Sequence, residues 1–129
     1  MLAVTGRPYD TLSEVIGDKT KNGDGSLADF GISYDEVAIL PDGSVDFAGI
    51  ERKLRELGSR VKVVFIQRSK GYANRPTLSS EEIGKIAAFS KARSDAYVVV
   101  DNCYGEFCDR TEPTAHGADI VVGSLIKNP

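Results

Sequence analysis

Three short runs of mostly β-branched residues constrain the fold of this chain more than any other feature. They occupy residues 61–66, 97–100 and 119–122. Each run is almost continuously apolar, which is typical of strands that are buried on both faces of a parallel sheet. Helical patterns separate the runs, so the sequence predicts an α/β fold with three layers: a mostly parallel sheet and helices on both of its faces.

Helix signals fill the segments between these runs. Residues 47–57 place apolar side chains at helical spacing, directly after Asp46, a residue type that caps helix N-termini. Ser79 and Glu82 form a capping box, which predicts a second helix that ends near residue 93. The two helices therefore alternate with the apolar runs, as in βαβ units.

The remaining predicted elements are short. A helical pattern at residues 10–16 is followed by Gly17, which favours a helix end there. The other expected elements are strands at residues 2–4 and 36–40, a turn at residues 41–43 and a polar loop at residues 18–31.

Composition excludes several classes of protein. The chain has 129 residues, enough for one domain, and its net charge of -3 argues against a nucleic-acid-binding scaffold. It has neither a membrane-length apolar stretch nor the basic start of a signal peptide, which favours a cytoplasmic protein without membrane contact. Cys103, Cys108 and the lone His116 lack the spacing of a metal site, so no metal is predicted.

Residues that could take part in binding or catalysis come directly after two of the apolar runs. Asp101 and Asn102 follow one run, and Ser124 and Lys127 follow the last. Taken singly, Asp101 would be a structural acceptor, Ser124 a turn residue and Lys127 a surface lysine. Ligands of open parallel sheets bind outside the carboxyl ends of the strands, where these residues would meet. Pyridoxal phosphate needs an acid at its ring nitrogen, a donor for its phosphate and a lysine for attachment, so the combination favours that cofactor.

Several separated motifs then resemble a known family. "VVVDNCYGEF", "EPTAHGADIVVGSLIKNP", "GRPYDTLSEVIG", "GSLADFGISYDEV" and "IQRSKGYANRPTLSSEEI" are similar to the aluminium-resistance or methionine gamma-lyase-like family of pyridoxal-phosphate enzymes, which have the aspartate-aminotransferase fold (fold type I). The resemblance implies that Lys127 forms the Schiff base with the cofactor. It also implies that Asp101 pairs with the pyridine nitrogen, and that Ser124 and Asn102 help to bind the cofactor.

The same resemblance implies that residues 1–129 are part of a larger enzyme. They would form part of its large domain, with a phosphate-loop segment upstream and a small domain downstream. The parent would be a homodimer or homotetramer, and the isolated chain would be inactive. Related lyases carry a hydroxyl residue just before the lysine, whereas this chain has Ile126 there.

The loop after the first apolar run offers candidates for substrate recognition. Arg68, Tyr72 and Arg75 could bind a substrate carboxylate, or the loop could simply be solvated. Tyr104 and Glu106 are weaker candidates, and Tyr9 could face the site without an assigned role.

The implied reaction is elimination of a thiol from a methionine-like amino acid, a carbon–sulfur lyase activity. Lys127, partly desolvated between Leu125 and Ile126, would act as the base. Transamination, β-elimination or replacement remain open because the same constellation supports them. A second hypothesis is an inactive α/β binding or structural module. A nucleotide-binding module is a third, although neither Gly-rich phosphate motif occurs in the sequence.

Overall fold

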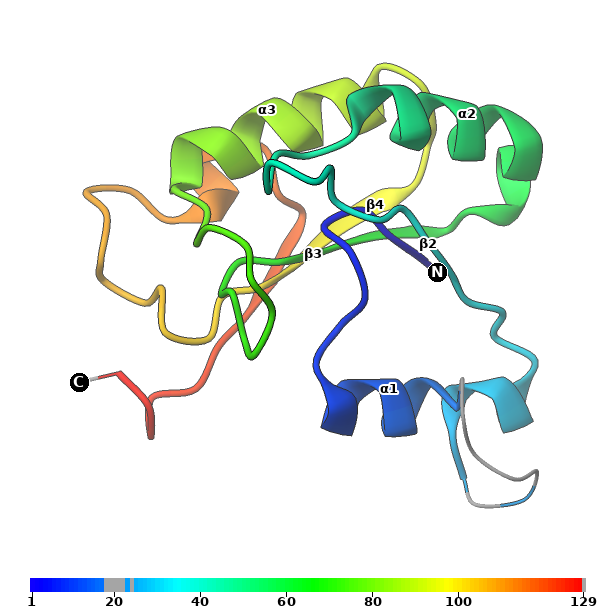
Figure 1. Cartoon of the computed structure of the whole chain (residues 1–129), viewed down its shortest axis with the longest axis horizontal. Helices are drawn as coiled ribbons and strands as arrows, with labels where there is room; N and C mark the ends of the chain where they lie inside the picture. Colours follow the sequence, from blue (N-terminus) through cyan, green and yellow to red (C-terminus); the bar gives the residue numbers. More distant parts are fainter. Residues whose placement is uncertain (18–22, 24, 129) are drawn as a thin grey trace.

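The computed structural model describes residues 1–17, 23 and 25–128. Its centre is a sheet of five strands in the order β2-β1-β3-β4-β5 (Figure 1). All neighbouring strands are parallel, which confirms the predicted α/β class. The strands are β1 (Leu2–Ala3), β2 (Asp35–Glu36), β3 (Val63–Gln67), β4 (Tyr97–Asp101) and β5 (Ile120–Val122).

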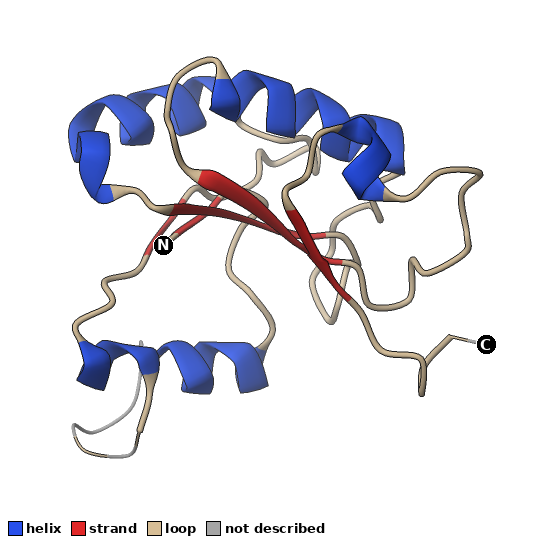
Figure 2. Cartoon of the chain, turned by 180° about the vertical axis from the view of Figure 1, so that it is seen from behind, coloured by secondary structure: helices blue, strands red, loops and turns tan. Residues whose placement is uncertain are grey.

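Helices lie on both faces of the sheet. Helices α2 (Phe47–Leu57) and α3 (Ser80–Lys91) lie side by side over one face, and α1 (Asp10–Ile16) lies on the other (Figures 1 and 2). The rings of Phe47 and Phe89 pack edge to face between α2 and α3, with centroids 5.0 Å apart. The three predicted layers are therefore present.

The main core lies between the sheet and the pair α2 and α3. Strand alternation directs one set of side chains toward the helices, and helical spacing directs another set back. Burying a Val, Leu or Ile side chain contributes about 1.5–3 kcal/mol, so this layer supplies much of the folding free energy. Its fully buried members include Ile50, Val64, Ile66, Ile83, Val98 and Val100.

The residues predicted to cap these helix ends do so in the structure. Ser79 and Glu82 form the capping box of α3, and Asp46 accepts a hydrogen bond of 2.8 Å from the Gly49 N–H at the start of α2. Gly17 ends α1 in the left-handed conformation, with φ 88°. An L-residue would be strained at Gly17, and its Cβ would also lie 2.4 Å from Ser26 Oγ.

Several predicted boundaries are wrong. The strand expected at residues 36–40 reduces to Asp35–Glu36, because the chain turns at residues 40–44, where the Gly43 N–H donates to Leu40 O. The strand expected at residues 61–66 begins at Val63, after a 3-10 helix at Gly58–Arg60. The polar loop expected at residues 18–31 contains a 3-10 helix at Leu27–Phe30; residues 18–22 and 24 of that loop lie outside the described residues.

The parallel sheet brings three loops to one edge. These are the loops that follow the carboxyl ends of β3, β4 and β5. Another 3-10 helix, Pro113–His116, leads from the loop after β4 into β5. The edge where the three loops meet is the location predicted for a ligand site.

Candidate functional site

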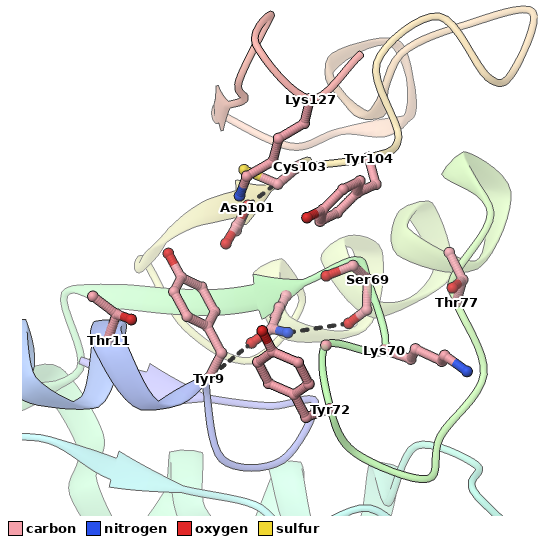
Figure 3. Close-up of a pocket in the computed structure, with 12 residues that line it drawn as sticks. Tyr9, Thr11, Ser69, Lys70, Tyr72, Thr77, Asp101, Cys103, Tyr104 and Lys127 are labelled. Carbon is pink, nitrogen blue, oxygen red and sulfur yellow. Dashed lines mark hydrogen bonds between the residues drawn. The ribbon is translucent and has the colours of Figure 1, made fainter.

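A cavity of about 550 Å³ opens at this edge of the sheet. Figure 3 shows side chains from the loops after β1, β3, β4 and β5 around it. It therefore gathers residues that lie far apart in the sequence. The lining residues are Tyr9, Thr11, Gln67, Ser69, Lys70, Gly71, Tyr72, Thr77, Asp101, Cys103, Tyr104 and Lys127.

Asp101 is the buried acid of the cavity. It is the last residue of β4, opposite Gln67 of β3 and Val122 of β5, and only 5% of its surface is exposed. Its Oδ1 accepts a hydrogen bond of 3.0 Å from the Cys103 N–H. Two neighbouring strands and this turn fix the carboxylate, so its orientation toward the cavity is set by the sheet.

Lys127 reaches the same cavity from the segment after β5. Its Nζ lies 5.0 Å from the centroid of the Tyr104 ring, within range of a cation–π contact. Figure 3 shows the amine directed toward Asp101 and Cys103. The electrostatic interaction with Cys103, the largest influence, raises the pKa of Lys127 and outweighs the opposing effect of burial.

The expectation that Leu125 and Ile126 desolvate Lys127 is wrong for this chain. Leu125 is 72% exposed and Ile126 is 99% exposed. Neither of these side chains therefore shields the amine from water. The reason is topological: the segment leaves the sheet after β5, which is an edge strand here.

Several cavity residues, among them Tyr9, Gln67 and Ser69, had no role in the sequence-based prediction. The Tyr9 N–H donates to Gln67 Oε1 (3.1 Å), and Gln67 Nε2 donates to Ser69 O (3.2 Å). Gln67, 3% exposed, thus ties the loop after β1 to the loop after β3. Burial, and then the negative charges of Asp101 and Cys103, raise the pKa of the Tyr9 phenol. Their position at the end of β3 or in the loops after β1 and β3 was the available signal.

Arg68 lies outside the cavity. It is 3% exposed, and its guanidinium donates four hydrogen bonds: Nε to Leu78 O (2.9 Å), Nη1 to Asn102 Oδ1 (2.7 Å) and Gly105 O (2.9 Å), and Nη2 to Asp109 (2.7 Å). These bonds connect β3, the loop after β4 and the start of α3. This placement gives Arg68 a structural task and leaves no donor directed at a substrate in the cavity.

Arg75 is also buried and lies outside the cavity. Its Nη1 donates to Thr5 O, and its Nη2 donates to Ser69 O at 3.0 Å. Burial lowers the pKa of its guanidinium. Of the three proposed substrate residues in this loop, the cavity includes Tyr72, whose side chain is 99% exposed at its rim.

Asn102 and Ser124 are absent from the cavity lining. Asn102 is 1% exposed and, besides accepting from Arg68, donates to Glu112 Oε2 at 2.8 Å. The Ser124 N–H donates to Glu106 Oε1. The structure therefore brings Asp101, Lys127, Tyr72 and Tyr104 together and leaves these two residues beside the site.

The sequence and the fold of this chain match those of known proteins. A family model described as methionine gamma-lyase matches residues 1–129. The chain belongs to the methionine gamma-lyase family. Among described residues, this family member has no helix with the length and apolar character needed to cross a membrane.

Solved structures share the fold of this methionine gamma-lyase family member. A Listeria innocua protein, provisionally named a cystathionine beta-lyase involved in aluminium resistance, is 49% identical with a TM-score of 0.93; the match covers 99% of this chain and 31% of that one. A Clostridium novyi protein, named a carbon–sulfur lyase involved in aluminium resistance, is 46% identical with a TM-score of 0.89. That match covers 98% of this chain and 29% of the other.

A Bacillus subtilis relative, YnbB, is 45% identical over 130 residues, which cover all of this chain and 30% of YnbB. The chain thus spans less than a third of the length of each of these three relatives. An acid, an amine and a phenol around one cavity can bind a small polar molecule and move protons on it.

Proposed function

We propose that this chain forms the cofactor-bearing part of a carbon–sulfur lyase that uses pyridoxal phosphate and acts on sulfur-containing amino acids. One observation carries the proposal: Asp101 and Lys127, from different strand ends, line the same cavity. The family match and the lyase names of the relatives support the reaction class.

Two residues of the cavity, Asp101 and Lys127, suit two groups of the cofactor. Asp101 presents a buried carboxylate beside the apolar end of β4, where low polarity strengthens its pairing with a protonated ring nitrogen. Lys127 presents the primary amine that covalent attachment requires. The cavity of about 550 Å³ lies within the usual range for sites of small molecules and cofactors.

The phosphate end depends on other groups. The backbone N–H of Ser124 is already donated to Glu106, so a phosphate contact by Ser124 would use its hydroxyl. We propose that further phosphate donors come from outside residues 1–129, as the family resemblance implies. We therefore expect tight binding of the cofactor only when those donors are present.

The proposed chemistry assigns distinct tasks to the residues of this chain. Bound pyridoxal phosphate supplies an electron-withdrawing ring that stabilises negative charge at the α-carbon of an amino acid. Asp101 keeps the ring nitrogen protonated. Lys127, as a neutral amine, would remove the proton from the α-carbon.

The test uses the full-length protein with Lys127→Ala and a control, Lys62→Ala. Lys62 is exposed and precedes the amino end of β3, away from the cavity. Each variant is incubated with pyridoxal phosphate, reduced with borohydride and examined by peptide mass spectrometry. Thiol and ketoacid release from methionine and cystathionine is measured in parallel.

The proposal expects cofactor mass on the Lys127 peptide of the parent and of the control, and none in Lys127→Ala. Thiol release should fall at least ~1,000-fold in Lys127→Ala, as is usual when the base and the attachment point are removed together. Cofactor retained at the same site in Lys127→Ala would refute the assignment. Ketoacid release without thiol would replace the lyase with a transaminase.

A further inference from the structure

The turn that carries Lys127 has little apolar packing of its own. The Lys127 N–H donates to Ser124 O at 2.9 Å, and the Asn128 N–H donates to the same oxygen at 3.3 Å. The two apolar side chains of the turn, Leu125 and Ile126, are 72% and 99% exposed. Burial therefore does not decide where this turn lies, and polar contacts must do so.

Glu106 supplies those contacts from the loop after β4. Its side-chain Oε1 accepts from the Ser124 N–H, and its backbone oxygen accepts from Asn128 Nδ2 at 3.0 Å. One residue is thus bonded on both sides of Lys127. Glu106 is 8% exposed, so these bonds are largely shielded from competing water.

The backbone beside Glu106 is fixed on each side. Gly105 O accepts from Arg68 Nη1 at 2.9 Å, and the Phe107 N–H donates to Glu112 Oε1 at 2.8 Å. Gly123 permits the approach of the carboxylate, because a Cβ at that position would lie 2.5 Å from Glu106 Oε1. The backbone of Glu106 is consequently held on both sides, and its carboxylate packs closely against Gly123.

The carboxylate of Glu106 is ionised at neutral pH. Burial acts to raise its pKa, but backbone N–H donors, led by that of Ser124, together with the positive charge of Lys127, lower it overall. Among the described residues, its buried Oε2 has no hydrogen-bond partner. Oε1 is therefore the carboxylate oxygen that contacts the turn, through the Ser124 N–H.

We propose that Glu106 is a positioning residue for Lys127: it holds the turn at residues 124–128 so that the amine enters the cavity beside Asp101. The catalytic consequence rests on the proposed function, whereas the mechanical role does not. Glu106 itself does not line the cavity, so it acts through Ser124 and Asn128.

The experiment compares Glu106→Ala, Glu106→Gln, Gly123→Ala and the control Glu81→Ala in the full-length protein. Glu81 is an exposed acid on α3. Amide hydrogen exchange is measured without cofactor for peptides that cover residues 123–128, with β3 and β4 as internal references. The rate and extent of cofactor attachment to Lys127 are measured separately.

Glu106→Ala should raise exchange at residues 123–128 at least ~10-fold, the order expected when one charge-assisted hydrogen bond is lost. Gly123→Ala should do the same, because its Cβ displaces the carboxylate while the acid remains. Glu106→Gln keeps an accepting oxygen and should stay within ~3-fold of the parent. Cofactor attachment should slow in the first two variants and not in the control.

Unchanged exchange at residues 123–128 in Glu106→Ala would overturn the proposal. So would equal rises in β3 and β4, which would mean general destabilisation. If Glu106→Ala fails to fold, Gly123→Ala and Glu106→Gln still decide, since the proposal requires them to differ. If exchange follows the expectation but cofactor never attaches at Lys127 of the parent, the proposed function fails and the positioning role stands.

Discussion

Replacing Arg68 by alanine tests whether this residue is structural or binds substrate. The guanidinium makes four hydrogen bonds at 2.7–2.9 Å from a side chain that is 3% exposed. After its removal, Asp109 keeps the Ser80 N–H as a donor, and Gly105 O keeps the Cys108 N–H. Leu78 O and Asn102 Oδ1 keep no other donor among the described residues.

The expected loss follows from those two orphaned acceptors and from the severed ion pair. Each buried acceptor without a partner costs about 1–3 kcal/mol. Removing one member of a buried ion pair costs about 3–5 kcal/mol, and the side chain of Asp109, which is 35% exposed, favours the lower end. We therefore expect Arg68→Ala to lower the free energy of unfolding by at least about 3 kcal/mol, a large part of the stability of an ordinary domain.

Urea unfolding followed by circular dichroism measures this loss. Lys70→Ala, an exposed position in the same loop, is the control and should change stability by less than about 0.5 kcal/mol. Arg68→Lys keeps the charge but cannot reproduce the fork of donors, so it should lie between the alanine variant and the parent. An Arg68→Ala variant within about 1 kcal/mol of the parent, with a raised KM in the full-length enzyme, would refute the structural assignment.

Three further variants follow from the same contacts. Asp101→Asn in the full-length enzyme should still bind cofactor but lose at least ~100-fold in turnover, because an amide cannot hold the ring nitrogen protonated; near-normal kcat would make Asp101 merely structural. The Ser80 N–H, together with Arg68, lowers the pKa of Asp109, so its stabilising effect is present above the unfolded value of about 3.9 and is lost as pH falls through the lower folded pKa. Asp109→Asn should therefore reduce the fall in the free energy of unfolding at acid pH. A fall as steep as that of the parent would contradict this. Ile83→Ala, at a fully buried position of α3, should cost about 2–5 kcal/mol in urea unfolding, and a loss below about 1 kcal/mol would mean that the core is packed differently.

The sequence by itself determined the fold class and the helix ends. These follow from signals that are local along the chain. Apolar runs specify buried strands, the capping box at Ser79 begins α3, and Gly17 ends α1 in a conformation that other residues resist. The order of apolar runs and helices also predicted that Asp101 and Lys127 meet, because parallel strands end at one edge.

Only the tertiary structure decided which neighbouring polar residues enter the cavity. Arg68 and Gln67 are adjacent in the sequence, yet Gln67 lines the cavity and Arg68 lies outside it, bound to three other segments. Neighbours at a strand end point to opposite faces of the sheet, so a shift of one residue exchanges their roles. The ends of β2 and β3, and the exposure of Leu125 and Ile126, likewise depend on which segments lie alongside, and no local pattern records that.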